Sequence, residues 1–471
     1  MTFWLWTLGT LYLVGLVVIA VHSWRKTEGA EDYMFAGSNV GVLLGLLTYS
    51  ATLFSTFTLM GMPDFFRAHG VGAWIFLAVS DGAQVFLVVW FGYHLRKRAR
   101  TLGFRGTAGL LSALYENRWA GYVFFVGVFL FLVPYVAIQV RGLAIFLEAV
   151  FPGALPAWIW SSLIVIAMLL YSEIGGLRAI IYSDALQGLT LLTVIWIVGI
   201  GCVQHFGGVG AMFESVQNTE EALLSTPGPE GLFSPQFLVA SFLGVLLLPV
   251  TQPQLTTRLI VIRSTDKMNR MAVSIGGFAL LILLPVVAIG MYGGVEYADA
   301  TTREFLSNVL LFEQSGLVGA AAVVGLLTAA MSTADAQIFA LGTELRSLLS
   351  GDEDVVLRQT KVAIILFGLA ALGFSIVSSD ELVLLARVSF NGTALLAPLG
   401  LAGVLGDHTP GPEVVAAPAL GLALFLASLL GLIPDTVGPA RLDLLLLVGI
   451  ALVTGGSILY RTATSHEQAA S

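Results

Sequence analysis

The chain has 471 residues, of which 57% are hydrophobic and only 11% are charged, and its formal net charge is -8. A soluble domain of this length would need far more charge to cover its surface, so the composition excludes an ordinary globular protein and indicates that lipid is the main solvent. Nothing in it favours nucleic-acid binding, and one cysteine, Cys202, excludes an intrachain disulfide.

The most prominent feature of the chain is a series of apolar stretches, each near the ~20 residues that a helix needs to cross a bilayer. We therefore predict an all-α membrane protein with about 13 transmembrane helices. The first stretch has no preceding basic segment and no small-residue cleavage site, so we expect a retained span rather than a signal peptide. The stretches are 4–22, 43–62, 73–95, 120–148, 154–173, 180–204, 235–257, 272–296, 316–343, 360–378, 381–404, 413–433 and 441–460.

Basic residues are distributed unevenly among the gaps between these stretches. Most of the 22 Lys and Arg residues follow the odd-numbered spans, as Arg96 and Lys97 follow the third and Arg258 the seventh. Short loops rich in Lys and Arg stay in the cytoplasm, so we predict an extracellular N-terminus and a cytoplasmic C-terminus in the inner (plasma) membrane. Arg141 and Arg387 lie within spans instead, and we expect Arg387 to snorkel toward the outer interface.

The spans fall into two units of similar length. Spans two to six occupy residues 43–204 and spans seven to eleven occupy 235–404, and the two units begin on opposite sides of the membrane. Two five-helix units of opposite topology are typical of transporters built from inverted repeats. We therefore predict a single transporter domain over 1–471, with an extra N-terminal span at 4–22, two extra C-terminal spans in 413–460, and a polar loop at 205–234.

Hydroxyl side chains are concentrated in the second and ninth spans. The stretch 43–62 holds several Ser and Thr residues, and in 316–343 the pair Ser332 and Thr333 is followed by Asp335. A single hydroxyl in a membrane helix usually bonds to a carbonyl three or four residues earlier. A cluster beside a carboxylate favours a hard monovalent cation such as sodium, which prefers oxygen ligands.

Two further features interrupt the apolar pattern. Asp184 enters the membrane with the sixth span, and an intramembrane carboxylate is a functional candidate because its burial is costly. The alternative is a carboxylate that the free N–H groups at a helix start stabilise. In the seventh span Pro249 and Pro253 each remove a backbone donor, which predicts a helix break at Gln252.

The segments GGLRAIIYSDALQG, AAMSTAD and TQPQLTTR together resemble the sodium/solute symporter family, whose members carry proline, pantothenate, sugars, sialic acid or monocarboxylates. The resemblance covers the whole chain and implies the LeuT-type fold with a 5+5 inverted repeat. It also implies sodium-coupled import of a small organic solute. Sodium would be the only metal, and the solute and the lipid bilayer the partners, with no obligate protein partner evident.

The resemblance further implies where the shared sodium binds. The family uses three backbone carbonyls and two hydroxyls, which here correspond to the carbonyls of Ala51, Phe54 and Ala329 and the side chains of Ser332 and Thr333. All five positions carry usable oxygens, and this set suits a weakly held monovalent ion.

Some family members hold a second sodium at the position of Asp184, with hydroxyls one turn after the Ser-Thr pair. Asp335 and Ala336 stand at those places here. Two bare carboxylates in a medium of low dielectric constant are unfavourable, so a cation bridges Asp184 and Asp335 or one of them is protonated. Asp335 alternatively bonds to backbone on the cytoplasmic side.

Solute contacts in the family come from the two helix breaks and the walls that face them. Asp81 and Arg141 are charged residues inside apolar runs. Either they pair with each other or with other buried groups, or Arg141 holds a solute carboxylate while Asp81 receives an ammonium or hydroxyl group. The second possibility favours a small carboxylate or amino acid over a neutral sugar. The candidates are Thr52, Ser55, Thr56, Thr58, Asp81, Gln84, Gln139, Arg141, Gln252 and Gln254.

Two other functions stay open at this stage. A proton-coupled carrier would use Asp184 or Asp335 as its proton relay. A membrane sensor on a transporter scaffold is disfavoured because no signalling domain is attached. We do not expect an enzyme, because the six histidines show no metal-ligand pairing and no nucleophile–base constellation stands out.

Overall fold

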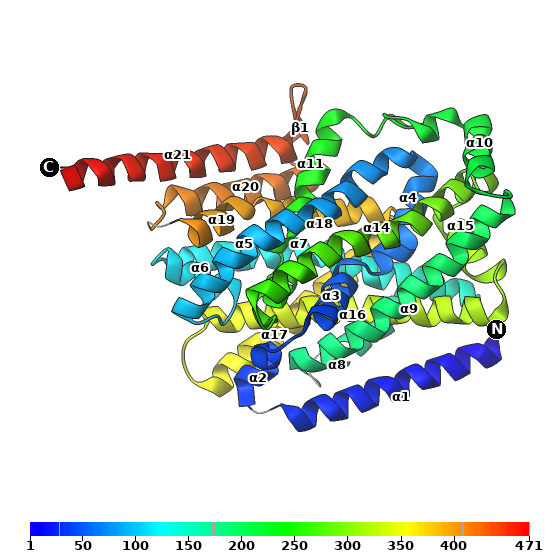
Figure 1. The fold of residues 1–471 in the computed structure, drawn as a ribbon, viewed down its shortest axis with the longest axis horizontal. Coiled ribbons are helices and arrows are strands. Elements are labelled where there is room, and N and C mark those ends of the chain that lie inside the picture. Colours follow the sequence, from blue (N-terminus) through cyan, green and yellow to red (C-terminus); the bar gives the residue numbers. More distant parts are fainter. Residues whose placement is uncertain (28, 172–175, 407–408, 471) are drawn as a thin grey trace.

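The computed structural model describes the chain except residues 28, 172–175, 407–408 and 471, and almost everything it describes is helical (Figure 1). Helices dominate because lipid offers no hydrogen-bond partners, so the backbone must satisfy its own N–H and C=O groups. The two strands of the described residues, β1 (Thr436–Val437) and β2 (Ala440–Arg441), pair antiparallel in one short hairpin.

The first half of the chain forms nine α-helices joined by short 3₁₀ or π segments. The α-helices are α1 (Thr2–Lys26), α2 (Gly29–Phe35), α3 (Val42–Leu53), α4 (Met62–His69), α5 (Ser80–Leu102), α6 (Thr107–Leu114), α7 (Arg118–Val150), α8 (Ala157–Tyr171) and α9 (Gly176–His205). The short segments are η1 (Ala36–Ser38), η2 (Phe57–Gly61), η3 (Val71–Ala73) and η4 (Ile75–Val79).

The second half continues in the same way. Its helices are α10 (Val209–Thr219), α11 (Pro235–Leu246), α12 (Leu248–Thr251), α13 (Pro253–Val261), α14 (Thr265–Glu296), α15 (Thr302–Ser307), α16 (Gly316–Leu348), α17 (Glu353–Val377), α18 (Leu382–Ala394), α19 (Ala397–Leu405), α20 (Glu413–Leu429) and α21 (Leu442–Ala470). The short segments are η5 (Glu221–Leu224) and η6 (Asn308–Phe312).

Within the described residues, nine helices are long and apolar enough to cross a membrane, and the bent pair of α3 with the segment from Phe57 to His69 makes a tenth. The predicted spans at 154–173, 235–257 and 413–433 contain shorter apolar helices, Ala157–Leu169, Pro235–Leu246 and Glu413–Leu429. Each predicted stretch therefore contains helix within the residues that the structure describes, while the count of 13 spans and the 5+5 repeat stay predictions.

The interval 205–234 differs from the polar loop that we predicted, because it contains the helix α10. Met212 and Val216 lie one turn apart on α10 and are both buried, which gives the helix one apolar face to pack against α14. The apolar residues at helical spacing, Val209, Met212, Phe213 and Val216, are the signal in the sequence that could have revealed this helix.

Helices α1 and α21 lie along opposite edges of the bundle, and the marked N- and C-terminal ends lie at opposite ends of it (Figure 1). Between them, α9 packs against α3, α14 and α16, while α7 packs against α16, α17 and α18. The broken helices are held inside this frame, since α5 contacts α11, α12 and α13 and α3 contacts α9 and α14.

The first helix break separates α3 from η2. Phe54 leaves the helix with an extended backbone, and the two halves bend by 59°. Local hydroxyls replace helical bonds at this point: Ser55 N–H donates to Thr58 Oγ1 at 3.2 Å, and Phe57 N–H donates to Ser55 Oγ at 3.3 Å. Ser and Thr side chains can therefore end this helix by competing with its backbone acceptors.

The second break confirms the prediction from the prolines. Helix α12 ends at Thr251, Gln252 is extended, and α13 begins at Pro253. Pro253 has no N–H to donate to the Pro249 carbonyl. The Thr256 hydroxyl takes over that role and donates to the carbonyls of Pro249 at 3.3 Å and Gln252 at 3.1 Å.

Candidate functional site

Asp184 lies at the centre of a buried polar network that joins four helices. Its Oδ2 accepts hydrogen bonds from Thr48 Oγ1 of α3 at 2.5 Å and from Arg258 Nη2 of α13 at 2.8 Å. Its Oδ1 accepts one from the Ser332 hydroxyl of α16. Arg258 Nε also donates to Thr48 Oγ1 at 3.0 Å, and all four side chains are at most 1% exposed. Asp184 is therefore held by side chains and not by the first turn of α9.

The position of Arg258 corrects the prediction that it lies in a cytoplasmic loop. The residue belongs to α13, directly after the second break, and its Nη1 donates to the Gln254 carbonyl at 2.8 Å. A buried guanidinium is stable only when it is paired and hydrogen-bonded, and Asp184 supplies the missing charge. Hydropathy places Arg258 in the gap that follows the seventh span. The arginine is also the last residue of the segment TQPQLTTR, which carries part of the family resemblance.

The first predicted sodium ligands lie where α3 ends against α16. Ser55 N–H, the donor that would continue the helix to the Ala51 carbonyl, donates to Thr58 instead. The Thr333 hydroxyl faces the Ala51 carbonyl at 3.4 Å. The structure thus brings Ala51 and Thr333 together, whereas the Ser332 hydroxyl is directed at Asp184.

Asp335 is the second carboxylate of this region, one turn beyond Ser332 on α16. It is 2% exposed, and its Oδ1 has no hydrogen-bond partner within the described part of the chain. An unpaired buried polar atom costs about 1–3 kcal/mol, and more when it is charged. Because Arg258 neutralises only one of Asp184 and Asp335, the pair of carboxylates retains one uncompensated charge when both are ionised.

The predicted solute residues at the first break divide into two groups. Thr52, Ser55 and Thr58 take part in local bonds that shape the break, since Thr52 Oγ1 donates to the Thr48 carbonyl at 2.8 Å. Thr56 is different, because its buried Oγ1 has no partner among the described residues. Its methyl group contacts α7 so closely that a Cβ on Gly142 would lie 2.4 Å from Thr56 Cγ2.

Several other predicted solute residues also carry unpaired polar atoms. Gln139 stands on α7 one turn before Gly142, and its buried Oε1 lacks a partner among the described residues. At the second break, Gln254 Nε2 donates to Gln252 Oε1 at 2.6 Å, which leaves Gln252 Nε2 and Gln254 Oε1 without partners in that same set. Buried polar atoms normally have partners, so each of these atoms is suited to a polar ligand.

Asp81 and Arg141 do not pair with each other. Arg141 Nε donates to Asp380 Oδ1 at 2.7 Å, and this pair is partly exposed, with side chains 19% and 36% accessible. Arg141 is thus already neutralised by Asp380. Asp81 is 3% exposed and accepts a hydrogen bond from Gln84 Nε2 at 2.9 Å, and Gln84 Oε1 accepts one from Tyr49 of α3 at 3.2 Å.

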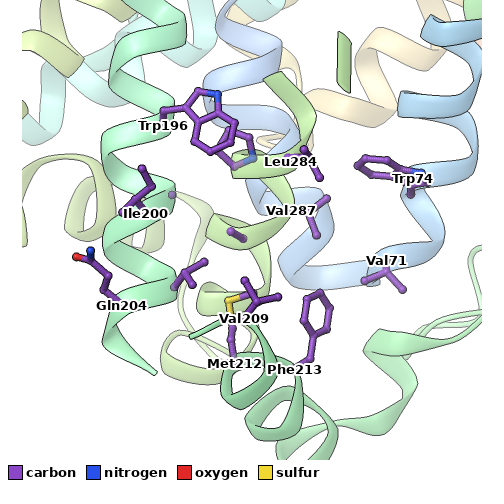
Figure 2. Close-up of a pocket in the computed structure, with 14 residues that line it drawn as sticks. Val71, Trp74, Trp196, Ile200, Gln204, Val209, Met212, Phe213, Leu284 and Val287 are labelled. Atoms are coloured by element: carbon purple, nitrogen blue, oxygen red, sulfur yellow. The ribbon is translucent and has the colours of Figure 1, made fainter. Parts of the chain in front are cut away.

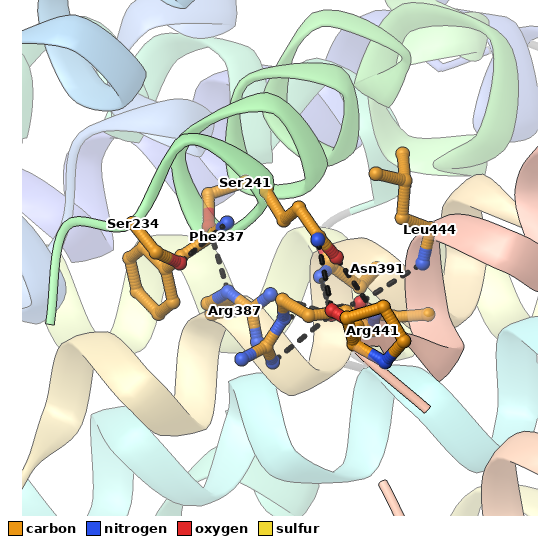
Figure 3. A network of polar contacts seen from close by, with 10 residues as sticks. Ser234, Phe237, Ser241, Arg387, Asn391, Arg441 and Leu444 are labelled. Carbon is orange, nitrogen blue, oxygen red and sulfur yellow. Dashed lines mark hydrogen bonds and ion pairs between the residues drawn. The ribbon is translucent and has the colours of Figure 1, made fainter. Parts of the chain in front are cut away.

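Arg387 is paired inside the protein rather than snorkelling as predicted, and 12% of its side chain is accessible. Its Nε donates to Ser241 of α11 at 2.7 Å, and its Nη2 donates to Asp443 of α21 at 2.5 Å (Figure 3). Asn391 donates to the same carboxylate, and the guanidinium lies over the Phe237 ring, 4.4 Å from its centroid. The network joins α11, α18 and α21, so it fixes the C-terminal helix to the bundle.

A cavity of about 510 Å³ lies elsewhere, between η3, α9, α10 and α14. Figure 2 shows Trp74, Trp196, Val209 and Phe213 around it, and Gln204 is the most polar of its lining residues. None of the predicted ion or solute residues lines this cavity. The cavity and the predicted ion and solute residues are therefore separate places in the fold.

Comparison with known proteins identifies one family. The sodium:solute symporter family matches residues 33–345, which include both helix breaks and the Asp184 network. The sodium/pantothenate symporter of Escherichia coli is 25% identical over 305 residues, 63% of this chain and 60% of that protein. A high-affinity proline transporter of Bacillus subtilis is 23% identical over 352 residues, 70% of each chain. The match thus spans less than two thirds of the pantothenate symporter.

Solved structures share the fold. A substrate-bound, outward-open sodium-coupled sialic acid symporter superposes with a TM-score of 0.75 and 16% identity, over 96% of both chains. The structure of MhsT in complex with L-phenylalanine superposes with a TM-score of 0.56 and 16% identity, over 88% of this chain and 98% of that one. At these identities the likeness concerns the arrangement of helices.

Proposed function

Because this chain belongs to the sodium:solute symporter family, we propose that it is a sodium-coupled secondary symporter that imports a small organic solute by alternating access. The solute class that fits best is a carboxylate or amino acid. Sodium and solute would bind at the two helix breaks, and the bundle would then rock to release both on the cytoplasmic side. Each ligand would raise the affinity for the other by the same factor.

One sodium site would comprise the carbonyls of Ala51, Phe54 and Ala329 and the hydroxyls of Ser332 and Thr333. The observation that carries this proposal is the Thr333 hydroxyl facing the Ala51 carbonyl at the broken end of α3. That carbonyl has lost its helical donor and accepts a long hydrogen bond from Thr333 instead, so both oxygens could turn their lone pairs to a cation. In the present geometry Ser332 would have to turn from Asp184 toward the ion.

Asp184 and Asp335 would form a second cation or proton site. Arg258 already balances one of the two carboxylates, which leaves room for one further positive charge near Asp335. A sodium ion or a proton would each meet this need. The unpartnered Asp335 oxygen therefore favours a proton-coupled carrier as the second candidate function, with Asp335 as the relay.

The solute would bind between the breaks and the walls formed by α5 and α7. The unpaired atoms of Thr56, Gln139, Gln252 and Gln254 support this placement. Arg141 is the least suited of the candidates, since its charge is already matched by Asp380. The full set remains Thr52, Ser55, Thr56, Thr58, Asp81, Gln84, Gln139, Arg141, Gln252 and Gln254.

We further propose the finer architecture predicted from the sequence: 13 spans, two inverted five-helix units at 43–204 and 235–404, and extra spans at 4–22 and within 413–460. The N-terminus would lie outside the plasma membrane and the C-terminus inside. Ends of the chain on opposite sides require an odd number of crossings, and the two marked ends in Figure 1 lie at opposite ends of the bundle.

The test is the thermal stability of the purified protein when sodium replaces potassium at constant ionic strength. Binding of sodium to the folded state alone raises stability by RT ln(1 + [Na⁺]/Kd), so the melting temperature should rise with sodium and less in Thr333→Ala. A panel of small carboxylates, amino acids and sugars is then added in each salt. A solute shift that is equal in sodium and potassium would contradict sodium coupling and favour the proton-coupled carrier.

A further inference from the structure

Asp81 is a buried carboxylate on α5, a helix that packs against the second broken helix. It lies on the buried face of α5 together with Gln84 and Val88, and this helix packs against α11, α12 and α13. Asp81 is 3% exposed, and it is an electrostatic neighbour of Tyr49 on α3 and Tyr135 on α7. Tyr135 in turn donates to the Leu53 carbonyl at 3.2 Å, directly at the first break. Asp81 therefore stands among the elements that form both breaks.

No cation balances Asp81 within the described part of the chain. Its one hydrogen bond comes from the neutral amide of Gln84, whose oxygen is occupied by Tyr49. Arg141 of α7 and Arg258 of α13 are matched elsewhere, Arg141 by Asp380 and Arg258 by Asp184. Arg96, the next cation on α5, lies roughly 22 Å further along the helix and donates to the carbonyls of Leu259 and Ile260.

We propose that the Asp81 carboxylate binds an ammonium group of the solute, which makes the solute an amino acid or a related ammonium compound rather than a simple carboxylate or a sugar. This inference rests on the proposed function of the site. A lone buried carboxylate is unfavourable, and an ammonium group removes that cost while it gains charge-assisted hydrogen bonds. The solute is then the counter-ion that the chain itself lacks.

The second break provides a partner for the carboxylate group of such a solute, and this partner is not an arginine. Gln252 Nε2 is a buried donor with no partner among the described residues, and it sits at the break that packs against α5. The beginning of α13 directly after it contributes the positive end of a helix dipole, which favours an anionic group. Asp81 on α5 and Gln252 at the end of α12 thus offer groups of opposite polarity on two elements that pack together.

The experiment compares matched ligands on the purified full-length protein. Common L-amino acids are paired with the carboxylates that lack only the amino group, such as L-leucine with 4-methylpentanoate, and sugars are added as a third set. Thermal shifts are measured in sodium and in potassium. We expect sodium-dependent shifts from one or more amino acids and none from their deamino partners.

Asp81→Asn keeps the shape of the side chain and removes its charge. It should lower the affinity for the amino acid that binds best by roughly 30-fold or more. Asp380→Asn is the matched control, because it removes a carboxylate paired with Arg141, and it should change that affinity by less than about threefold. Retained sodium stabilisation in Asp81→Asn shows that this variant is folded.

Three results would overturn the inference: a deamino carboxylate or sugar that binds best, full affinity in Asp81→Asn, or no amino acid that binds. The first two leave sodium-coupled symport intact when the shift requires sodium. An amino-acid shift that depends on Asp81 but not on sodium would support the ammonium site and contradict the sodium coupling instead.

Discussion

Arg258 of α13 and Asp184 of α9 form an ion pair at 2.8 Å in which both side chains are almost completely buried. The pair connects the segment after the second break to the helix that carries the Asp184 network. Thr48 of the first broken helix and Ser332 of α16 bond to the same carboxylate. Both broken helices and α16 therefore meet at one charge, so a single carboxylate links the first break, the second break and α16 through direct contacts.

Removal of one partner of this pair should strongly destabilise the protein. Arg258→Gln leaves Asp184 as an uncompensated buried charge, and we expect a loss of about 3–5 kcal/mol, measured by thermal or denaturant unfolding in detergent. The double variant Arg258→Gln with Asp184→Asn should recover much of that loss, because both charges are removed together. Equal instability of the single and double variants would contradict the charge argument.

Loss of the Thr333 hydroxyl should weaken sodium activation. Thr333→Ala removes an oxygen at the proposed sodium site, and we expect the sodium concentration for half-maximal uptake in proteoliposomes to rise about tenfold, equivalent to ~1.4 kcal/mol. Thr343→Ala is the matched control, since that hydroxyl on the same helix bonds back to the Phe339 carbonyl at 3.0 Å. An unchanged sodium dependence in Thr333→Ala would remove this residue from the site.

Neutralisation of Asp335 should change the charge that accompanies each solute molecule. In Asp335→Asn the uncompensated carboxylate beside the Arg258–Asp184 pair is gone, so no second cation or proton is needed there. We expect one positive charge fewer per solute, measured from reversal potentials in proteoliposomes. Wild-type coupling in this variant would show that Asp335 takes no part in ion movement.

Arg141 should contribute little to solute binding. Its guanidinium is already paired with Asp380 in a partly exposed position. We therefore expect Arg141→Gln to change the KM for solute by less than about threefold, in the range of ordinary partly exposed ion pairs. A large increase in KM, with normal folding, would return Arg141 to the role of carboxylate binder.

The Arg387–Asp443 pair should stabilise the attachment of α21. Asp443→Ala removes the carboxylate that pairs with Arg387, whose side chain is only 12% accessible, and we expect a loss of about 3 kcal/mol in unfolding experiments. Arg441 contacts the same carboxylate at 3.3 Å but is more exposed, with 26% of its side chain accessible. Arg441→Gln should therefore lower the free energy of unfolding by less than ~1 kcal/mol. A larger loss in Arg441→Gln than in Asp443→Ala would show that Arg441, and not Arg387, is the main partner of Asp443.

Features that depend only on residues close together in the sequence were predictable from the sequence alone. Apolar length predicts each membrane helix because the transfer of twenty such residues into lipid is favourable wherever they lie. The break at Gln252 was predictable because Pro253 lacks an N–H in any surroundings. The resemblance in three short segments identified the family, which its match over residues 33–345 confirms.

Partners far apart in sequence were decided by the tertiary structure. Arg258 resembles a loop cation in a hydropathy count, yet it is buried because Asp184, 74 residues away, neutralises it. Arg141 and Asp81 are both charged residues in apolar runs, but Asp380 pairs with only one of them. Composition and periodicity determine which segments enter the membrane, whereas the cost of each buried charge depends on the groups that packing brings within a few ångströms, and only the folded chain determines those groups.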